Sequence, residues 1–337
     1  MGKRVTMQDI ADKLKISKNS VSQALSGKPG VSEATRKKIE QTAKSLGYRY
    51  SGAKVNTNGG QSVGNIALIA SEFAFSLKSF FGEIYLAIDK EVKKRGMNLH
   101  IHSIDDVTRA NLVLPEDVEN NSVSGIIVLS HISTEYINKI INLGIPTVMI
   151  DHHHPFNHAD AILINNRFAA YKAVHHLIEL GHQNIGFVGN VDYSPSYLER
   201  WEGYLLALKD NDIEPKEELM VTDVAENGDS INNALNQINE LPTAWFCTND
   251  GYGFLILTSL QTRGLRVPKD ASVCSFDNGQ LSRISTPPTT TMNVDLTLYG
   301  KRAIEQLFWR MDNPNEPFQE TLIDSTIIIR DSTGPVN

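Results

Sequence analysis

The side chains best suited to reading a DNA sequence are grouped near the start of the chain, at Lys18, Asn19 and Gln23. The amides of Asn19 and Gln23 suit an adenine edge or, with less specificity, other bases, and Lys18 can reach guanine or a phosphate. A recognition helix presents its N-terminal outer residues to the major groove in this way. The spacing therefore predicts that these three residues are base readers.

Three short helices are needed to position them. Thr6, Ser17 and Ser32 are good N-caps, and each is followed by apolar residues at helical spacing. The inward residues expected are Ile10, Ala11 and Leu14 in the first helix, Val21, Ala24 and Leu25 in the second, and Ile39, Ala43 and Leu46 in the third. Small alanines let the first two helices cross closely, which indicates a helix–turn–helix head.

The predicted DNA-contact set extends beyond the base readers. Helix N-termini and positive charge favour phosphate contacts. The complete set is Thr6, Ser17, Lys18, Asn19, Ser20, Gln23, Lys28, Ser32 and Arg36. The alternative is a charged, merely solvated three-helix bundle, which the density of positive charge disfavours.

Charge divides the chain into two parts. Residues 1–50 carry eleven Lys and Arg against four Asp and Glu, which gives them a net charge of +7. Because the whole chain has a net charge of −7, residues 51–337 have a net charge of −14. An acidic body repels phosphate, so DNA contact should be confined to the head. The length of 337 residues indicates two or three domains.

Composition narrows the class of protein. No apolar run reaches membrane-span length and the N-terminus does not resemble a secretory signal, so we expect a cytoplasmic protein, nucleoid-associated when bound to DNA. Cys247 and Cys274 lie in apolar, strand-like runs and are expected to be buried, reduced thiols rather than a disulfide or a metal pair.

The head resembles that of the lactose/galactose repressor (LacI/GalR) family. The matching residues are Gln8-Asp-Ile-Ala, Ser20-Val-Ser-Gln-Ala-Leu-Ser-Gly, Val31-Ser-Glu-Ala-Thr-Arg and Leu46-Gly-Tyr. Most members have Arg where this chain has Gln23, which implies a different operator half-site. The linker, residues 51–63, departs from the family because it has no Pro-Asn and no leucine to wedge into the minor groove. Val55 is the only candidate wedge.

From residue 64 onward, short apolar runs alternate with amphipathic stretches in two successive sets. Strands are expected at 65–70, 98–104, 125–129, 146–151, 184–189, 244–248 and 272–276, and helices at 80–94, 136–143, 168–180, 198–211, 231–241 and 253–264. Such alternation predicts two parallel sheets covered on both faces, with ligands at the carboxyl ends of the strands between two lobes.

Catalytic motifs are missing from this body. Neither common phosphate-binding glycine loop, nor a nucleophile elbow, nor a zinc-binding helix motif is present, so we expect no enzyme and no cofactor. The run from Asp151 to His154 raises a metal hypothesis, but consecutive residues cannot all face one ion without a sharp turn. We interpret them as solvated loop histidines and predict no metal site.

The body resembles the same family's effector core, which is similar to periplasmic sugar-binding proteins. The matches include Glu199-Arg-Trp-Glu-Gly-Tyr, Thr248-Asn-Asp, Ser275-Phe-Asp and Thr286-Pro-Pro. The resemblance implies an N-terminal all-α helix–turn–helix head plus an α/β two-lobed periplasmic-binding-protein-like core with parallel sheets and three crossovers. It places the lobes at 64–165 plus 292–321 and at 166–291 plus 322–334.

By position, the resemblance assigns effector contacts to Arg200, Asn249 and Asp277, whose donors and acceptors can divide the hydroxyls of a sugar. Phe73, Phe75 and Phe80 follow the first strand and either stack on a pyranose or simply pack in the core. Arg200 or Asp277 forming an interlobe ion pair is the alternative.

The expected function is a homodimeric, sequence-specific transcriptional repressor whose operator affinity is set by a sugar or phosphosugar. The dimer is expected because the C-terminal residues 331–337 carry no leucine heptad. A solute-binding protein and an enzyme fused to a DNA-binding domain are the alternatives. The basic head argues against the first, and the lack of a catalytic constellation argues against the second.

Overall fold

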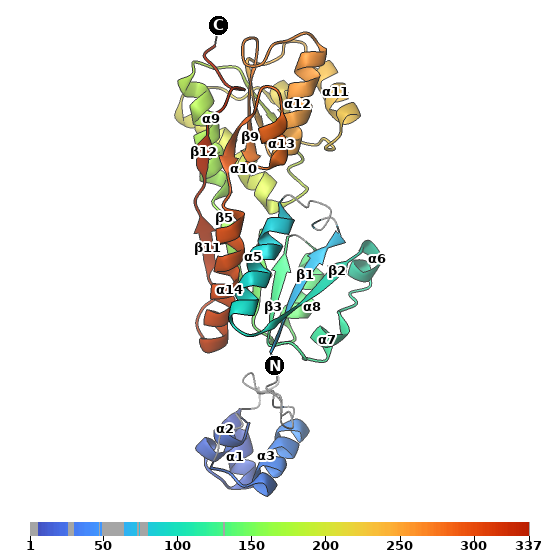
Figure 1. The fold of residues 1–337 in the computed structure, drawn as a ribbon, viewed down its shortest axis with the longest axis vertical. Helices are drawn as coiled ribbons and strands as arrows, with labels where there is room; N and C mark the ends of the chain where they lie inside the picture. Colours follow the sequence, from blue (N-terminus) through green and yellow to red (C-terminus); the bar gives the residue numbers. More distant parts are fainter. Residues whose placement is uncertain are drawn as a thin grey trace. The chain divides into compact units, whose positions relative to one another are not determined.

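The structure, a computed structural model, describes residues 6–25, 30–46, 48, 64–72, 74, 80–130 and 132–336. Compact packing divides the chain into two units, Met1–Gly64 and Asn65–Asn337. The first unit is the helical head and the second is the α/β core (Figure 1). The predicted linker, including Val55, lies outside the described residues.

The head consists of α1 (Met7–Leu14), α2 (Lys18–Leu25) and α3 (Glu33–Ser45). Its small core is made by the apolar residues that the helical spacing predicted, six of them fully or almost fully buried: Ile10, Ala11, Val21, Ala24, Ile39 and Ala43. Leu14, Leu25 and Leu46 pack against this core from partly buried positions. The left-handed conformation of Lys15 ends α1 and turns the chain into α2, which completes the helix–turn–helix.

The first lobe of the core contains a six-stranded parallel sheet in the order β11-β5-β4-β3-β1-β2. Its strands are β1 (Asn65–Ser71), β2 (Asn98–Ile104), β3 (Gly125–Leu129), β4 (Thr147–Ile150), β5 (Asp160–Ile164) and β11 (Glu320–Ile323). Its helices are α5 (Phe81–Lys94), α6 (Asp106–Ala110), α7 (Glu116–Glu119), α8 (Thr134–Ile141) and α14 (Leu296–Asp312). Strands β1, β3 and β5 bury almost every side chain, as a sheet covered on both faces requires.

The second lobe repeats this arrangement with the order β12-β10-β9-β8-β6-β7. The strands are β6 (Ile185–Val188), β7 (Met220–Val221), β8 (Ala244–Cys247), β9 (Ser272–Asp277), β10 (Thr290–Asn293) and β12 (Thr326–Ile328), of which β12 alone runs antiparallel to its neighbour. The helices are α9 (Asn166–Glu179), α10 (Pro195–Asp210), α11 (Gly228–Asn236), α12 (Asp250–Thr262), α13 (Gln280–Ile284) and the 3-10 turn η1 (Glu217–Leu219).

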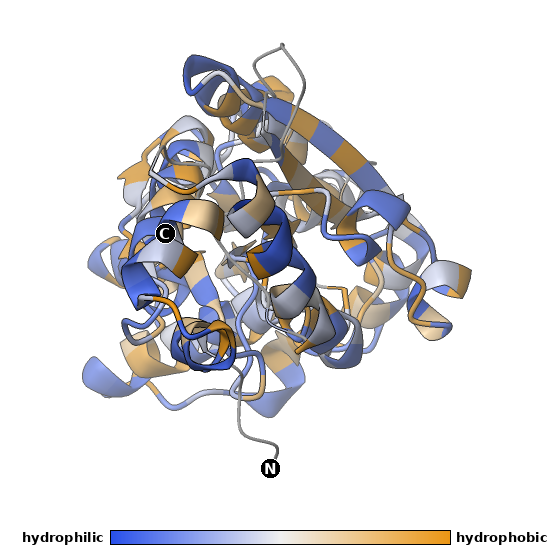
Figure 2. Ribbon diagram, turned by 90° about the horizontal axis from the view of Figure 1, so that it is seen from below, coloured by the Kyte–Doolittle hydropathy of each residue, from blue (hydrophilic) through white to orange (hydrophobic). Residues whose placement is uncertain are grey.

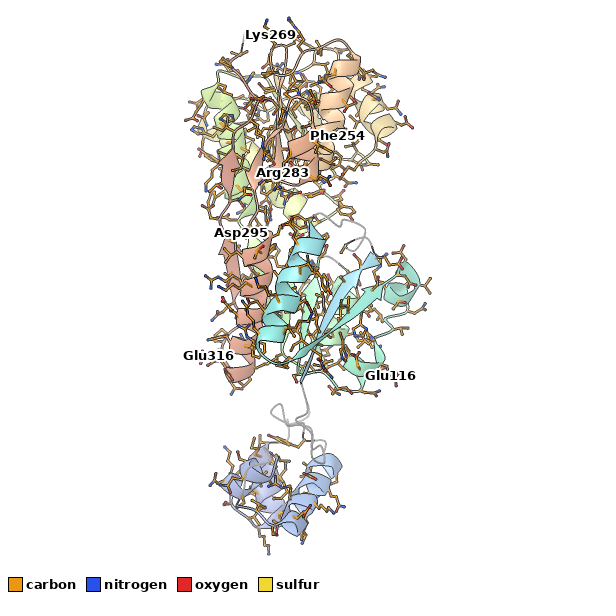
Figure 3. All side chains as sticks on the ribbon, in the orientation of Figure 1. Glu116, Phe254, Lys269, Arg283, Asp295 and Glu316 are labelled. Carbon is orange, nitrogen blue, oxygen red and sulfur yellow. The ribbon has the colours of Figure 1, made fainter. Side chains whose placement is uncertain are left out.

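Three passages of the chain join the two lobes. They follow β5, β10 and β11, as the order of strands in the two sheets requires. Asp295, which caps α14, lies where the chain returns to the first lobe (Figure 3). The second passage was expected after residue 291 and the third after residue 321, whereas β10 continues to Asn293 and β11 to Ile323.

Each lobe contains a pair of helices that approach closely at a glycine. A side chain on Gly203 of α10 would overlap the Arg167 carbonyl of α9. A side chain on Gly300 of α14 would likewise lie 2.7 Å from the Ile84 carbonyl of α5. The backbones of these helices therefore meet directly. Hydrophobic and hydrophilic residues alternate along the helical ribbons of the protein (Figure 2).

A buried ion pair fixes α14 to the first sheet. The guanidinium of Arg310 donates to both carboxylate oxygens of Asp160, at 2.6 and 2.9 Å, and also to the carbonyls of Asn313, Glu316 and Pro317. Asp160 is fully buried, so its charge depends on this arginine. The contact joins β5 to the return segment that leads into β11.

Elements near the end of the core were missed by the sequence analysis. Strands β5, β10, β11 and β12 and helix α14 were not predicted, and α11 lies at 228–236 rather than 231–241. Both cysteines are buried free thiols, as expected. Within the described ranges, no helix combines the length and the apolar character that a bilayer crossing needs.

Candidate effector site and DNA-reading head

The predicted base readers lie on one short helix. Lys18 and Asn19 are exposed in the first turn of α2, while Gln23 is half-buried one turn later, with its side-chain oxygen next to Gly30. No acidic residue lies in that first turn, so the helix N-terminus keeps its positive end free of a competing carboxylate. Lys28 lies outside the described residues.

The predicted phosphate-contact hydroxyls serve first as helix caps. Thr6 forms a reciprocal capping box with Asp9, Ser17 accepts from the Ser20 amide at 3.0 Å, and Ser32 accepts from the Thr35 amide at 3.3 Å. The Ser17 and Ser20 hydroxyls lie 2.9 Å apart. The caps thus fix the helix ends whose remaining backbone amides can meet phosphate.

Arg36 has a structural contact that the sequence analysis did not foresee. Its Nη1 donates to the carbonyl of Ala24 and, at 3.4 Å, to that of Gln23. These carbonyls end α2, where a cation also complements the helix dipole. Arg36 therefore connects α3 to the C-terminus of the recognition helix.

In the core, Arg200 is the centre of a polar cluster at the carboxyl ends of the second lobe's strands. It projects from α10 and is only 3% exposed. Its Nε donates to Asn166 Oδ1 at 2.9 Å, and its Nη1 donates to the Thr248 carbonyl at 2.5 Å. Its guanidinium lies 3.7 Å from the ring centroid of Phe276. Stacking and hydrogen bonds together hold its donor plane in one orientation.

Asp277, at the end of β9, faces this arginine. Its Oδ1 lies 3.3 Å from Arg200 Nη1, but among the described residues no donor makes a hydrogen bond to it. This ion pair lies within the second lobe, since α10 and β9 both belong to it, and is therefore not the interlobe pair of the alternative prediction.

Two carboxyl groups in this region resist ionisation. Burial raises the pKa of Asp277 to about 7 even though the Arg200 charge opposes that change. Burial also raises the pKa of Asp151, which follows β4 in the first lobe, to about 6. Both residues have positive φ, 105° for Asp277 and 56° for Asp151. Unfavourable backbone and unfavourable ionisation at the same positions are typical of binding sites.

The side chain of Asn249 caps a helix with its oxygen and donates hydrogen bonds to two neighbouring residues with its nitrogen. Its Oδ1 caps α12 by accepting from the Tyr252 amide at 2.8 Å. Its Nδ2 donates to the Tyr197 hydroxyl and to Glu226 Oε2, each at 2.7 Å. Burial and the nearby Glu226 charge raise the pKa of the Tyr197 hydroxyl well above its usual value. A ligand would therefore meet an amide already held by two oxygens.

The aromatic residues after β1 are only partly covered by the structure. Phe73 and Phe75 lie outside the described residues. Phe80 precedes α5, half-buried, with its ring 4.9 Å from that of Phe81 in an edge-to-face contact. Of the two roles considered for Phe80, stacking on a sugar or packing in the core, this contact agrees with packing in the core.

The histidine run after β4 lies in a loop, as interpreted, but its first member is not solvated. His152 is buried, with Nε2 3.0 Å from Asn157 Oδ1. His153 lies between Glu199 and Glu320, and the His154 ring contacts Phe156. Each imidazole thus has its own environment. In the described part of the chain, no three His, Cys, Asp or Glu side chains are grouped suitably for a metal ion.

Several residues of the cluster were not predicted as site residues. Asn166 and Glu199 contact Arg200 or its partners, and Glu226 and Tyr197 hold Asn249. Asp151 had a usable signal, since it directly follows a buried strand. Glu226 had none, because it lies in a polar loop with no periodic pattern.

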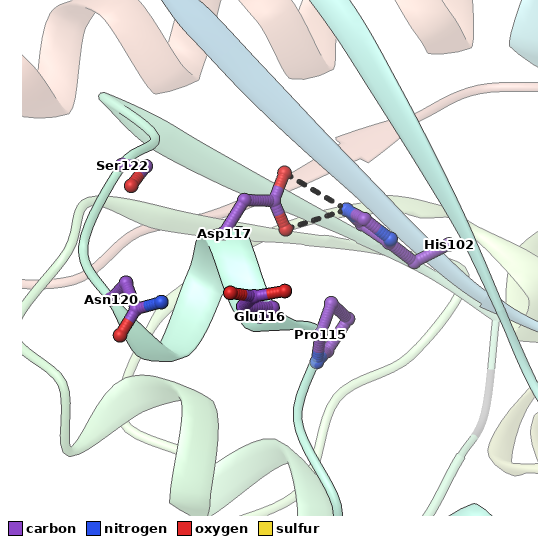
Figure 4. Close-up of a pocket in the computed structure, with 6 residues that line it drawn as sticks. All are labelled: His102, Pro115, Glu116, Asp117, Asn120 and Ser122. Carbon is purple, nitrogen blue, oxygen red and sulfur yellow. Dashed lines mark hydrogen bonds and ion pairs between the residues drawn. The ribbon is translucent and has the colours of Figure 1, made fainter.

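A separate pocket lies at the edge of the first lobe. It is lined by His102, Pro115, Glu116, Asp117, Asn120 and Ser122 (Figure 4). Burial opposes ionisation of Asp117, but hydrogen bonds from His100 and His102 hold its pKa below the usual value. The pocket shares no residue with the Arg200 cluster.

Comparisons with known proteins agree with this geometry. Residues 6–51 match the family described as bacterial regulatory proteins, lacI family, and residues 174–333 match a periplasmic binding protein-like domain. The HTH-type transcriptional repressor PurR of Actinobacillus pleuropneumoniae serotype 3 (strain JL03) is 28% identical, covering 98% of this chain and 99% of its own length. The probable HTH-type transcriptional repressor ExuR of Bacillus subtilis (strain 168) is also 28% identical, covering 97% and 98%.

Among solved structures, the lac repressor dimer bound to operator and the anti-inducer ONPF has a TM-score of 0.71 at 22% identity, with coverage of 98% of this chain and all of that one. The fold and the site thus define a helix–turn–helix protein with a two-lobed, periplasmic-binding-protein-like core. The chain is thus similar over nearly its whole length to bacterial regulatory proteins of the lacI family.

Proposed function

We propose that the protein is a transcriptional repressor that binds a specific operator through α2 and loosens or tightens that binding when a small effector contacts the Arg200 cluster. The proposal is carried by one observation: Asp277 Oδ1 accepts no hydrogen bond from the described residues, although it faces an Arg200 guanidinium that is held in one orientation. A paired acceptor and donor plane of this kind suits the vicinal hydroxyls of a sugar.

We assign the base-reading role to Lys18, Asn19 and Gln23, and phosphate contacts to the helix caps and basic residues around them. Lys18 and Asn19 are exposed at the N-terminus of α2, where a recognition helix meets base edges. Arg36 supports α2 from behind, and this structural role adds to its charge.

A homodimer is the assembly that fits a near-palindromic operator. Exposed apolar side chains on both lobes support the proposal of a homodimer. Leu86 of α5 is 62% exposed and Ile284 of α13 is 60% exposed, and contact with a second subunit would remove such side chains from water. Analytical ultracentrifugation of wild type and of Ile284→Asp tests this assembly: a monomeric wild type contradicts it.

Operator binding is tested by selecting bound fragments from a random duplex library and measuring their affinity by fluorescence anisotropy. The Asn19→Ala and Gln23→Ala variants should lose discrimination between selected and scrambled duplexes while keeping residual binding. Because phosphate contacts release counterions, the logarithm of affinity should fall linearly with the logarithm of salt concentration. Equal competition by scrambled DNA at physiological salt contradicts sequence-specific binding.

Effector binding is tested by thermal shift with neutral sugars and phosphosugars, followed by anisotropy on the selected duplex. A binding sugar should raise Tm and change operator affinity in the same concentration range. The repressor works in the cytoplasm, so sugars that enter bacterial cells are the compounds to screen first. Failure of all sugars removes the sugar assignment and leaves DNA recognition standing.

A further inference from the structure

His153 connects the two lobes through two carboxylates, one from each lobe. Its Nε2 lies 2.9 Å from Glu199 Oε1, on α10 of the second lobe. Its Nδ1 lies 3.3 Å from Glu320 Oε1, on β11 of the first lobe. The histidine itself belongs to the first lobe, in the loop between β4 and β5.

The imidazole can make both contacts only in one protonation state. A carboxylate offers acceptors alone, and a neutral imidazole carries a single N–H. With an acceptor at each ring nitrogen, both contacts are hydrogen bonds only when both nitrogens are protonated. The observed geometry is therefore that of an imidazolium shared by two carboxylates.

The contact with Glu199 continues to the effector arginine without a break. The other oxygen of Glu199, Oε2, accepts from Asn166 Nδ2 at 2.9 Å. Asn166 Oδ1 in turn accepts from Arg200 Nε at 2.9 Å. The buried Asn166 amide also donates to the Ile164 carbonyl at 3.2 Å, so moving Glu199 removes one of the two acceptors that fix the amide and weakens its hold on Arg200.

The charged groups around His153 favour its protonation. Glu199 faces it from α10, Glu320 faces it from β11, and Asp151 lies two residues away in the same loop. The hydrogen bond to Glu199 raises the pKa of His153 above its usual value, against the effect of burial. Burial opposes ionisation of Glu199. Hydrogen bonds from His153 and Asn166, together with the positive charge of Arg167 on α9, nevertheless lower the pKa of this carboxyl group.

We propose that His153 is a positioning residue that couples the first lobe to the effector-binding guanidinium of Arg200 through Glu199 and Asn166. The inference rests on the proposed function in that Arg200 is taken as the effector contact. When the lobes rearrange around an effector, the His153–Glu199 contact and the Arg200 orientation change together. Deprotonation of His153 releases one of its two carboxylates and weakens the same connection.

The test is a pH titration of the full-length protein by NMR, without effector or DNA. The His153 ring resonance and the Arg200 Nε resonance are followed together from pH 5 to 9 in an Asp151→Asn, Asp277→Asn background, because these two carboxyl groups act on Arg200 and titrate in the same interval. We expect the two to move with a common midpoint. In Glu199→Gln, which keeps the shape of the side chain and removes its charge, the His153 midpoint should fall and the Arg200 movement should disappear. His153→Gln should also abolish the Arg200 movement.

His154→Gln is the matched control, since His154 is adjacent but contacts Phe156 instead of a carboxylate. It should leave the movement of Arg200 intact. An Arg200 resonance that stays fixed while His153 titrates, or that moves equally in His153→Gln, overturns the coupling. Circular dichroism of each variant identifies any that fails to fold, and the non-additivity of His153→Gln and Glu199→Gln in Tm then supplies a second measurement. Since no DNA is present, these outcomes do not depend on operator recognition.

Discussion

Asp277 Oδ1 lies 3.3 Å from Arg200 Nη1 and accepts no hydrogen bond from any residue that the structure describes. The arginine, by contrast, has its Nε and Nη1 committed to Asn166 and Thr248. The pair therefore consists of a fixed cation and a carboxylate with spare acceptor capacity. This asymmetry suits a ligand that donates hydroxyls to the carboxylate.

Replacing Arg200 by Lys should weaken effector binding by about 10- to 100-fold, the loss expected for one or two hydrogen bonds to a charged group. Lysine keeps the charge but loses the planar fork and the stacking on Phe276. Isothermal titration with the sugar identified by thermal shift measures the change. Arg167→Lys, an exposed change one helix away, is the control and should bind normally. Unchanged affinity in Arg200→Lys removes this arginine from the site.

Replacing Asp277 by Asn should stabilise the protein at pH 8 and should do so less than half as much at pH 5. The folded-state pKa of about 7 lies above the unfolded value of 3.8, so the folded state binds more protons in this interval. Stability contributed by this group is then lost as pH rises from about 4 to 7. The gain at pH 8 should be on the order of 2 kcal/mol, after discounting for relaxation.

Urea unfolding at both pH values measures this difference in the free energy of unfolding. Asp312→Asn, at the exposed end of α14, provides a control that should show no pH-dependent gain. A gain of equal size at pH 5 and pH 8 contradicts a raised pKa at Asp277.

Changing Gln23 to Arg should move base preference toward guanine at one position of each operator half-site. An amide suits adenine, whereas a guanidinium makes a bidentate contact with guanine O6 and N7 worth about 1–3 kcal/mol of discrimination. Selection from a random duplex library with both proteins shows the shift. Lys13→Arg, on α1, is a control that leaves the selected sequence unchanged. Identical selected sites for the wild type and the Gln23→Arg variant exclude position 23 from base reading.

Replacing Asp160 by Ala should destabilise the core by about 3–5 kcal/mol, because Arg310 is left as an uncompensated buried charge. The expected result is a large fall in Tm with little change in how the selected duplex is recognised below the transition. Asp324→Ala removes an exposed partner of Lys172 instead and should cost less than about 1 kcal/mol. Similar losses in the two variants contradict the special role of burial.

Periodicity explains why much of the architecture could be predicted. Strands such as Gly125–Leu129 are uniformly apolar because helices cover both faces, and they alternate with amphipathic helices. Helix α14 was missed although it is long. It buries Tyr299, Gly300 and Arg310 alongside ordinary apolar residues, since it meets another helix at a glycine and a carboxylate in the sheet. Most of its buried residues nevertheless follow helical spacing, at Leu296, Tyr299, Ala303, Ile304 and Leu307, so the sequence did carry a helical pattern there.

The site could be predicted in part, from motifs that resemble those of a known family. Arg200, Asn249 and Asp277 matched family motifs, and the structure brings Arg200 and Asp277 together on neighbouring elements of one lobe. The roles of Glu226 and His153 depend on partners 23 and 46 positions away, Asn249 and Glu199. No spacing rule connects residues that meet only after the lobes have formed.

The three passages between the lobes also determine the order in which the protein can be made. Strand β11, Glu320–Ile323, completes the first sheet beside β5, although every other strand of that sheet has been translated by Ile164. During translation, the head therefore emerges from the ribosome and can fold long before either lobe of the core is complete. During that interval β5 lacks its neighbour β11, so the first sheet has an unpaired edge that can associate with other chains.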